Sequence, residues 1–168
     1  MNHLAHCFLS FGDEDLLLGN FIGDFVKGND WQQYPAAVQQ GILLHRTIDS
    51  YTDNHPMTDR SVARIRPYAG RYSPPFTDIL YDHLLALNWE KYTDEPFDDF
   101  AEKTYRQLEN RRAEMPPVLQ ERLPKMTAGI RRRSSARPGM RGVGTHAHGR
   151  VRRCNACAAH QSVRPGVS

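Results

Sequence analysis

The residues best suited to chemistry in this 168-residue sequence are aspartates and histidines that stand in pairs within otherwise apolar stretches. Residues four apart project from the same side of a helix, so His45 and Asp49 can ligate one ion through an imidazole nitrogen and a carboxylate oxygen. A buried carboxylate without a partner is costly, and a divalent cation compensates several carboxylates at once. The sequence therefore predicts a metal site. Its candidate ligands are Asp24, His45, Asp49, Asp82 and His83.

The mixed nitrogen and oxygen ligands favour Mn²⁺, Fe²⁺ or Zn²⁺ over Ca²⁺, and nothing in the set suggests a thiolate site. Each residue also has a structural interpretation. Asp24 could cap a neighbouring helix, Asp49 could pair with Arg46, and Asp82 could face solvent. For each residue taken alone, the structural role is the more common one. For the residues taken together, a shared metal ion explains them as well as separate structural roles do. His6 is a further candidate beside the site.

The elements that position these residues are predicted to be helices. Apolar residues recur at steps of three and four, and no stretch shows the sustained alternation of a strand. The fold class is therefore all-α, a compact single-domain bundle of short-looped helices. The expected helices cover about residues 2–11, 17–26, 36–53, 59–68, 76–92, 97–113 and 117–126.

The composition changes abruptly near residue 130. Residues 1–129 hold 13 Lys+Arg against 19 Asp+Glu, a formal charge of −6, whereas residues 130–168 hold nine arginines and no acid, lysine or aromatic residue. Such a segment cannot bury enough apolar surface to offset its ordering entropy, so we expect a disordered basic tail. Within it, Cys154, Cys157 and His160 resemble half a zinc site, but they lack the apolar surroundings of one, and we interpret the match as accidental.

The sequence also favours a cytoplasmic protein. Cys7 is the one cysteine of residues 1–129, so this part has no disulfide framework. The first residues lack the basic and apolar regions of a signal peptide. No apolar run approaches the ~20 residues that a membrane-spanning helix needs. Neither a membrane nor a nucleic-acid partner is expected.

Five stretches of the sequence, taken in order and spacing, resemble the acyl-carrier-protein phosphodiesterase family, a divergent relative of the HD-type metal-dependent phosphohydrolases. They cover residues 1–6, 19–28, 41–49, 52–56 and 81–84, and the resemblance extends over about residues 1–129. It implies hydrolysis of the phosphodiester that joins 4′-phosphopantetheine to a serine of holo-acyl carrier protein, which gives the apo protein. It also implies dependence on Mn²⁺, which activates the attacking water.

The resemblance gives further residues a place in this reaction. His83, His6 and Arg46 are the candidates to supply a proton or positive charge to the leaving serine oxygen. Asn20 lies near the site as a candidate substrate-binding residue. Arg60 and Arg64 belong to a basic stretch in an acidic body, and we expect them to bind the acidic carrier protein.

Two features depart from the family pattern. HD relatives usually show a His-Asp pair, whereas the order here is Asp82-His83. Beyond residue 129 the sequence resembles nothing in the family, which suggests a frameshift in the gene; amphipathic helices in another reading frame would support this hypothesis, and their absence would contradict it. The alternative functions are an HD-like phosphohydrolase acting on nucleotides and a non-catalytic helical interaction module with a basic tail.

Overall fold

The computed structural model describes residues 3–135, which form seven α-helices joined by loops and short 3₁₀ helices, with no strand among them. The all-α prediction is confirmed. The last helix continues past residue 129 to Ser135, and residues 136–168 of the predicted tail lie outside the described range. The α-helices are α1 (His3–Phe8), α2 (Glu14–Ile22), α3 (Ala36–Asp53), α4 (Pro56–Ala69), α5 (Ser73–Leu87), α6 (Phe97–Asn110) and α7 (Pro117–Ser135).

α4 and α5 begin earlier than the sequence predicted, because prolines at their first turns do not break them. A proline has no N–H, and the first N–H groups of a helix have no partner within it. α4 starts at Pro56, and His55 caps it by accepting a hydrogen bond from the Met57 N–H at 3.2 Å. α5 starts at Ser73, so that its two prolines fall in the first turn. The helix predicted over residues 17–26 ends at Ile22 and continues as the 3₁₀ turn η1 (Gly23–Phe25).

α2 and α3 cross at two glycines, where their backbones come into contact. A Cβ on Gly19 would lie 2.2 Å from the carbonyl oxygen of Val38, and one on Gly41 would lie 2.6 Å from that of Leu16. Any larger residue would push the helices apart. The crossing therefore requires glycine at both positions.

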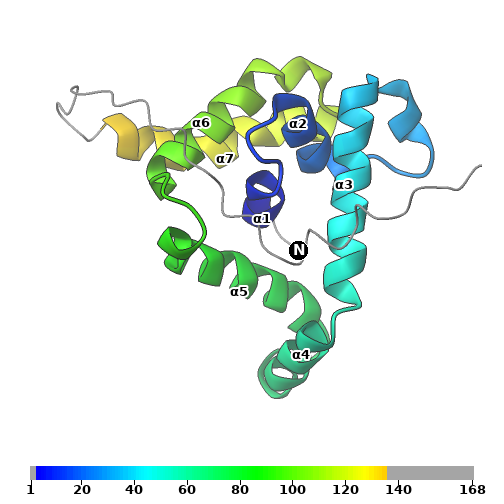
Figure 1. Ribbon diagram of the computed structural model, residues 1–168, viewed down its shortest axis with the longest axis vertical. Coiled ribbons are helices and arrows are strands. Elements are labelled where there is room, and N and C mark those ends of the chain that lie inside the picture. The colour runs from blue at the N-terminus through cyan, green and yellow to red at the C-terminus, as the bar shows by residue number, and fades with distance from the viewer. Residues whose placement is uncertain (1–2, 136–168) are drawn as a thin grey trace, which may run out of the picture.

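The hydrophobic core lies between α2, α3, α6 and α7, which form the larger body of the molecule (Figure 1). Burial of such side chains is the main contribution to the stability of this body. Its fully buried large side chains include Leu18, Phe21, Ile22, Ile42, Leu108, Leu119 and Leu123.

α4 and α5 form a hairpin, here called the arm, that extends from the end of α3 away from this body (Figure 1). α4 contains no buried residue, and α5 buries only Ser73 and Thr77. α1 lies between α5 and α3. Within the described residues, no helix has both the length and the apolar character needed to cross a membrane.

Candidate metal centre

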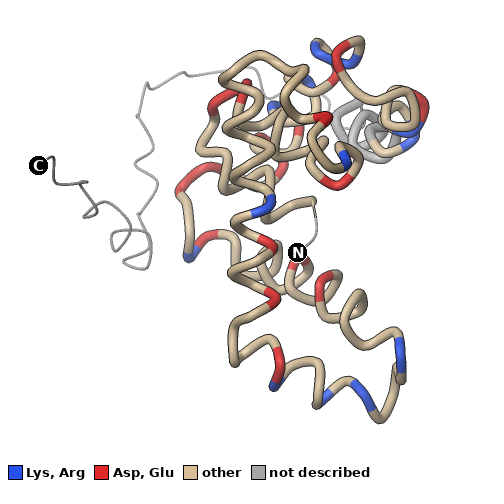
Figure 2. Tube along the Cα trace, turned by 90° about the vertical axis from the view of Figure 1, so that its right-hand side faces the viewer, with Lys and Arg blue, Asp and Glu red and all other residues tan. Residues whose placement is uncertain are grey.

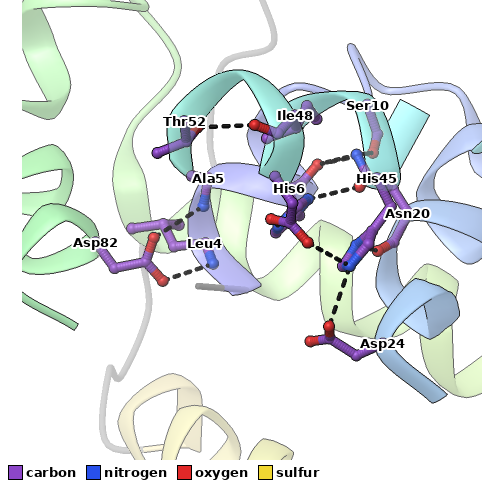
Figure 3. Close-up of polar contacts among 11 residues, drawn as sticks. Leu4, Ala5, His6, Ser10, Asn20, Asp24, His45, Ile48, Thr52 and Asp82 are labelled. Atoms are coloured by element: carbon purple, nitrogen blue, oxygen red, sulfur yellow. Dashed lines mark hydrogen bonds and ion pairs between the residues drawn. The ribbon is translucent and has the colours of Figure 1, made fainter. Parts of the chain in front are cut away.

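His6 of α1 and His45 of α3 lie next to each other (Figure 3). Asp49 lies beside both. Asp49 joins the two histidines: its Oδ1 lies 3.1 Å from His6 Nε2, and its Oδ2 lies 3.1 Å from His45 Nε2. The two imidazoles are stacked, with ring centroids 4.1 Å apart and planes inclined by 18°. One ligand atom from each residue falls within 4.8 Å of the others. Two nitrogens and a carboxylate are thus arranged so that they could hold one ion.

Asp24 adds a second carboxylate at the open side of this cluster. It comes from η1, and its Oδ1 lies 3.2 Å from His45 Nε2. Its side chain is 58% exposed, whereas that of Asp49 is 29% exposed and that of His45 4%. The cluster is therefore buried at the histidines and reaches solvent through the carboxylates.

Asn20 holds His6 from behind and fixes the position of its ring proton. The Asn20 amide nitrogen donates to the backbone carbonyl of His6 at 2.7 Å and to Ser10 Oγ at 3.1 Å. Its Oδ1 is therefore the acceptor that faces His6 Nδ1 at 2.8 Å. Nδ1 is thus the donor to Asn20, and Nε2 is the nitrogen that faces Asp49 and could ligate an ion in place of that contact.

His45 is held in the same way by the backbone of α2. Its Nδ1 lies 2.7 Å from the carbonyl oxygen of Asn20, which can only accept, so Nδ1 is the donor. Gly23 leaves room for the ring, since a Cβ there would lie 2.3 Å from His45 Cγ. The segment that carries Asn20 and Gly23 thus orients both histidines, and their Nε2 atoms converge on the carboxylates.

The electrostatics of the cluster favour charged side chains. Burial lowers the pKa of His45, but hydrogen bonds to Asp24 and Asp49 outweigh this effect and raise the pKa to about 9. The hydrogen bond from His45 lowers the pKa of Asp24. Burial raises the pKa of Asp49, and the hydrogen bonds of His45 and His6 more than reverse this, so the net shift is downward. A positive charge is therefore stabilised between these carboxylates, which is the condition for binding a cation.

Asp82, the predicted distal ligand, makes a different contact. Its Oδ2 accepts a hydrogen bond from the Leu4 N–H at 2.9 Å and its Oδ1 one from the Ala5 N–H at 3.1 Å. Figure 3 shows this carboxylate apart from His45 and Asp24. It satisfies amides at the start of α1, which have no acceptor within the helix, and so joins the arm to the helix that carries His6.

His83 lies on α5 next to Asp82 and is exposed. Successive helical residues point about 100° apart, so an aspartate directed at α1 leaves its neighbour turned away. Of the five candidate ligands, the structure thus brings together Asp24, His45 and Asp49. It adds His6, which the sequence placed only beside the site.

The structure also places the four remaining predicted site residues. The Arg46 guanidinium donates to the carbonyl oxygens of Val26 at 3.3 Å and Gly28 at 3.1 Å, and so holds the loop that follows Asp24. Arg60 and Arg64 are exposed on α4 of the arm. Asn20 is fully buried, and this geometry favours a positioning role over the predicted binding of substrate.

Ser10 and Gly23 were not among the predicted site residues. Ser10 is buried, and its hydroxyl donates to the His6 carbonyl at 2.9 Å. Gly23 precedes Asp24 directly, and a glycine next to a candidate ligand was the available signal. His3 lies beside Phe21, with ring centroids 5.2 Å apart. Burial lowers the pKa of His3.

Comparison with known proteins identifies relatives over much of the chain. The model of the family described as acyl carrier protein phosphodiesterase matches residues 1–160, so the similarity extends past residue 129, where the sequence was expected to depart from the family. The acyl carrier protein phosphodiesterase of Enterobacter sp. (strain 638) is 36% identical over 118 residues, which cover 70% of this chain and 61% of the relative. The protein of the same name from Photorhabdus laumondii is 43% identical over 91 residues, 54% of this chain and 46% of the relative.

The chain therefore spans only about half to three fifths of the length of these curated relatives. The protein of the same name from Klebsiella pneumoniae (strain ATCC 700721 / MGH 78578) gives a similar result, with 38% identity over 109 residues and 56% of the relative covered. No solved structure matches the chain significantly.

Proposed function

Because this chain belongs to the acyl carrier protein phosphodiesterase family, we propose that it hydrolyses the phosphodiester between 4′-phosphopantetheine and the serine of holo-acyl carrier protein. The observation that carries this proposal is the buried pair His6 and His45, joined by Asp49 and open to solvent at Asp24. Such a set combines fixed nitrogen ligands with a carboxylate edge that a phosphodiester and water can reach. We also propose that the protein is cytoplasmic, as the sequence predicts.

We assign the metal ligands to His6, His45, Asp49 and Asp24, and the ion to Mn²⁺. Imidazole and carboxylate are ligands that Mn²⁺, Fe²⁺ and Zn²⁺ share, and Mn²⁺ is the one that the family resemblance implies. When bound, such an ion polarises a phosphoryl oxygen and makes water more acidic. The hydrogen bonds of Asn20 keep the ring of His6 in the orientation and tautomer that ligation needs.

The remaining steps belong to side chains at the edge of the cluster. Asp24 is the most exposed carboxylate there, and its lowered pKa keeps it ionised, so its outer oxygen can accept a proton from the attacking water. For the leaving serine oxygen, the candidate proton donors remain His83, His6 and Arg46. Arg46 holds the loop after Asp24, His6 belongs to the cluster, and His83 is exposed on α5.

The test is the release of phosphopantetheine from holo-acyl carrier protein by the full chain. We expect release with Mn²⁺, none in EDTA, and a loss of roughly 100-fold or more in kcat/KM for His45→Gln and Asp24→Asn. Nucleotide diesters and monoesters serve as competing substrates. Undiminished release in EDTA, or by the His45→Gln variant, would contradict the proposal.

A further inference from the structure

One face of α4 presents cations that the fold does not use. Met57, Arg60, Arg64 and Tyr68 follow at steps of three, four and four residues, so they project from the same side of the helix. All four are exposed, Tyr68 to 91% and Met57 to 52%. The Arg60 guanidinium lies 3.9 Å from the sulfur of Met57, as expected for neighbours on this side. These four residues are called the α4 face below.

The arginines of the arm differ from those of the main body in their partners. Arg106 and Arg111 of the body form ion pairs with nearby carboxylates. Within the described part of the chain, no carboxylate forms an ion pair with Arg60 or Arg64. In Figure 2 basic segments follow one another at the far end of the arm, whereas the main body mixes both signs. The α4 face is therefore a local positive region on a body of negative formal charge.

Exposed apolar groups lie among these cations and extend past the end of α4. In the following turn the Arg71 guanidinium stacks over the ring of Tyr72, 4.9 Å from its centroid, and Tyr72 is 59% exposed. α4 has no buried residue, so this surface contributes little to the core. Arginine and tyrosine are among the residues enriched at the energetic centres of protein interfaces. Their combination here points to a protein partner with an acidic surface.

The α4 face also stands close to the candidate metal centre along the chain. Asp49 lies one helical turn, about 6 Å, before the end of α3 at Asp53, and α4 begins at Pro56. α4 thus begins within a few residues of the helical turn that carries Asp49. The arm is joined to α1, which carries His6, through Asp82.

We propose that the α4 face is the docking surface for an acidic surface of the carrier-protein substrate, an inference that rests on the function proposed above. Electrostatic attraction steers such a partner and sets its orientation, and the exposed tyrosine and methionine supply the apolar contact. Recognition of the protein is then separate from recognition of the phosphodiester, since the first takes place on the arm and the second at the metal centre.

The test measures binding, so it does not depend on turnover. Holo-acyl carrier protein is titrated into the full chain in EDTA by calorimetry, at two salt concentrations. We expect Arg60→Glu and Arg64→Glu each to weaken binding roughly tenfold, and Tyr68→Ala to weaken it severalfold. Arg66→Glu is the matched control: Arg66 is exposed on the same helix but lies on the opposite side, so its variant should bind within about twofold of wild type.

Wild-type affinity in the Arg60→Glu/Arg64→Glu double variant would overturn the docking surface, as would an equal loss in Arg66→Glu, because net charge alone would then explain the effect. Lack of carrier-protein binding by the wild type, or binding of an oligonucleotide in its place through the same arginines, would also overturn it. Failure of the proposed function is a separate result: the wild type with Mn²⁺ would then not hydrolyse bis(p-nitrophenyl) phosphate, whatever the binding data show.

Discussion

At the scale of single residues, the candidate centre depends on Asn20, whose side chain and backbone each hold one histidine. Asn20→Ala removes the acceptor for His6 Nδ1 and the donor to the His6 carbonyl. Loss of such a supporting contact typically costs 10- to 100-fold in metal affinity, and we expect roughly that loss for Mn²⁺ by calorimetry. The unpaired groups should also lower the free energy of unfolding by about 1–3 kcal/mol.

Thr77→Ala is the control for this prediction. Thr77 is fully buried on α5, and its hydroxyl donates to the Ser73 carbonyl at 2.8 Å. Its removal should lower stability and leave the affinity for Mn²⁺ unchanged. If both variants bound Mn²⁺ as tightly as wild type, Asn20 would have a purely structural role.

His45 makes the stability of the metal-free protein depend on pH. Its pKa in the folded state is about 9, above the ~6.5 of an unfolded chain. A raised pKa contributes stability that is complete below about pH 6.5 and is lost as pH rises through about 9. Chemical denaturation in EDTA should therefore show a decreasing free energy of unfolding between pH 6.5 and 9. His45→Gln should flatten this decrease, and an unchanged slope in that variant would exclude His45 as its source.

At the scale of the elements, the crossing of α2 and α3 decides where the site residues meet. In Gly41→Ala the added Cβ would lie 2.6 Å from the Leu16 carbonyl oxygen and 2.8 Å from Gly19 Cα. Both neighbours are backbone atoms that cannot move alone, so we expect a loss of about 1–3 kcal/mol by denaturation, together with weaker Mn²⁺ binding as His45 shifts away from Asp24.

Gly28→Ala provides a comparison for the glycine at the crossing. Gly28 has φ of +51°, and nothing lies within 4 Å of an added Cβ. Its replacement should cost only the local backbone strain, about 1 kcal/mol, and leave Mn²⁺ binding intact. Equal effects of the two substitutions on Mn²⁺ affinity would contradict the role given to the crossing.

Variants of Asp82, which joins α5 to α1, distinguish two roles for this residue. If it holds the start of α1, Asp82→Ala should lower stability by about 0.5–2 kcal/mol, and Asp82→Asn, which keeps an acceptor oxygen, should lower it less. Affinity for Mn²⁺ should then follow the same order. If Asp82 instead ligates the ion, both variants should lose Mn²⁺ binding to a similar extent in the same titration. His83→Ala, at the adjacent exposed position, should bind Mn²⁺ like wild type.

At the scale of the whole molecule, the cluster joins segments that are distant in the sequence, so metal binding should stabilise the fold. His6 and Asp49 are 43 residues apart, and a site of this kind does not exist in the unfolded chain. At a free Mn²⁺ concentration 100 times the Kd, the gain is about 2.7 kcal/mol. Thermal unfolding should show a higher Tm with Mn²⁺ that EDTA reverses, whereas the His45→Gln variant should show no change.

The proposed metal centre and the proposed docking surface lie on different parts of the molecule, the main body and the arm. The main body supplies a rigid core behind the histidines, and the arm presents an exposed surface with few buried side chains. Fewer buried contacts mean that the arm opens at a lower free energy than the core. This arrangement suits a surface that binds another protein beside a site that must keep its geometry.

The sequence alone determined the features that depend on helical periodicity. Residues four apart lie on one side of a helix whatever surrounds it, so the pairing of His45 with Asp49 followed directly from the sequence. The all-α class followed from the same periodicity. Only the tertiary structure decided which helices meet: His6 joins the cluster because α1 lies against α3, Asp24 reaches His45 because two glycines let α2 and α3 touch, and Asp82 binds amides of α1. These contacts depend on the crossing points and steric fit of separate helices, which local spacing does not specify.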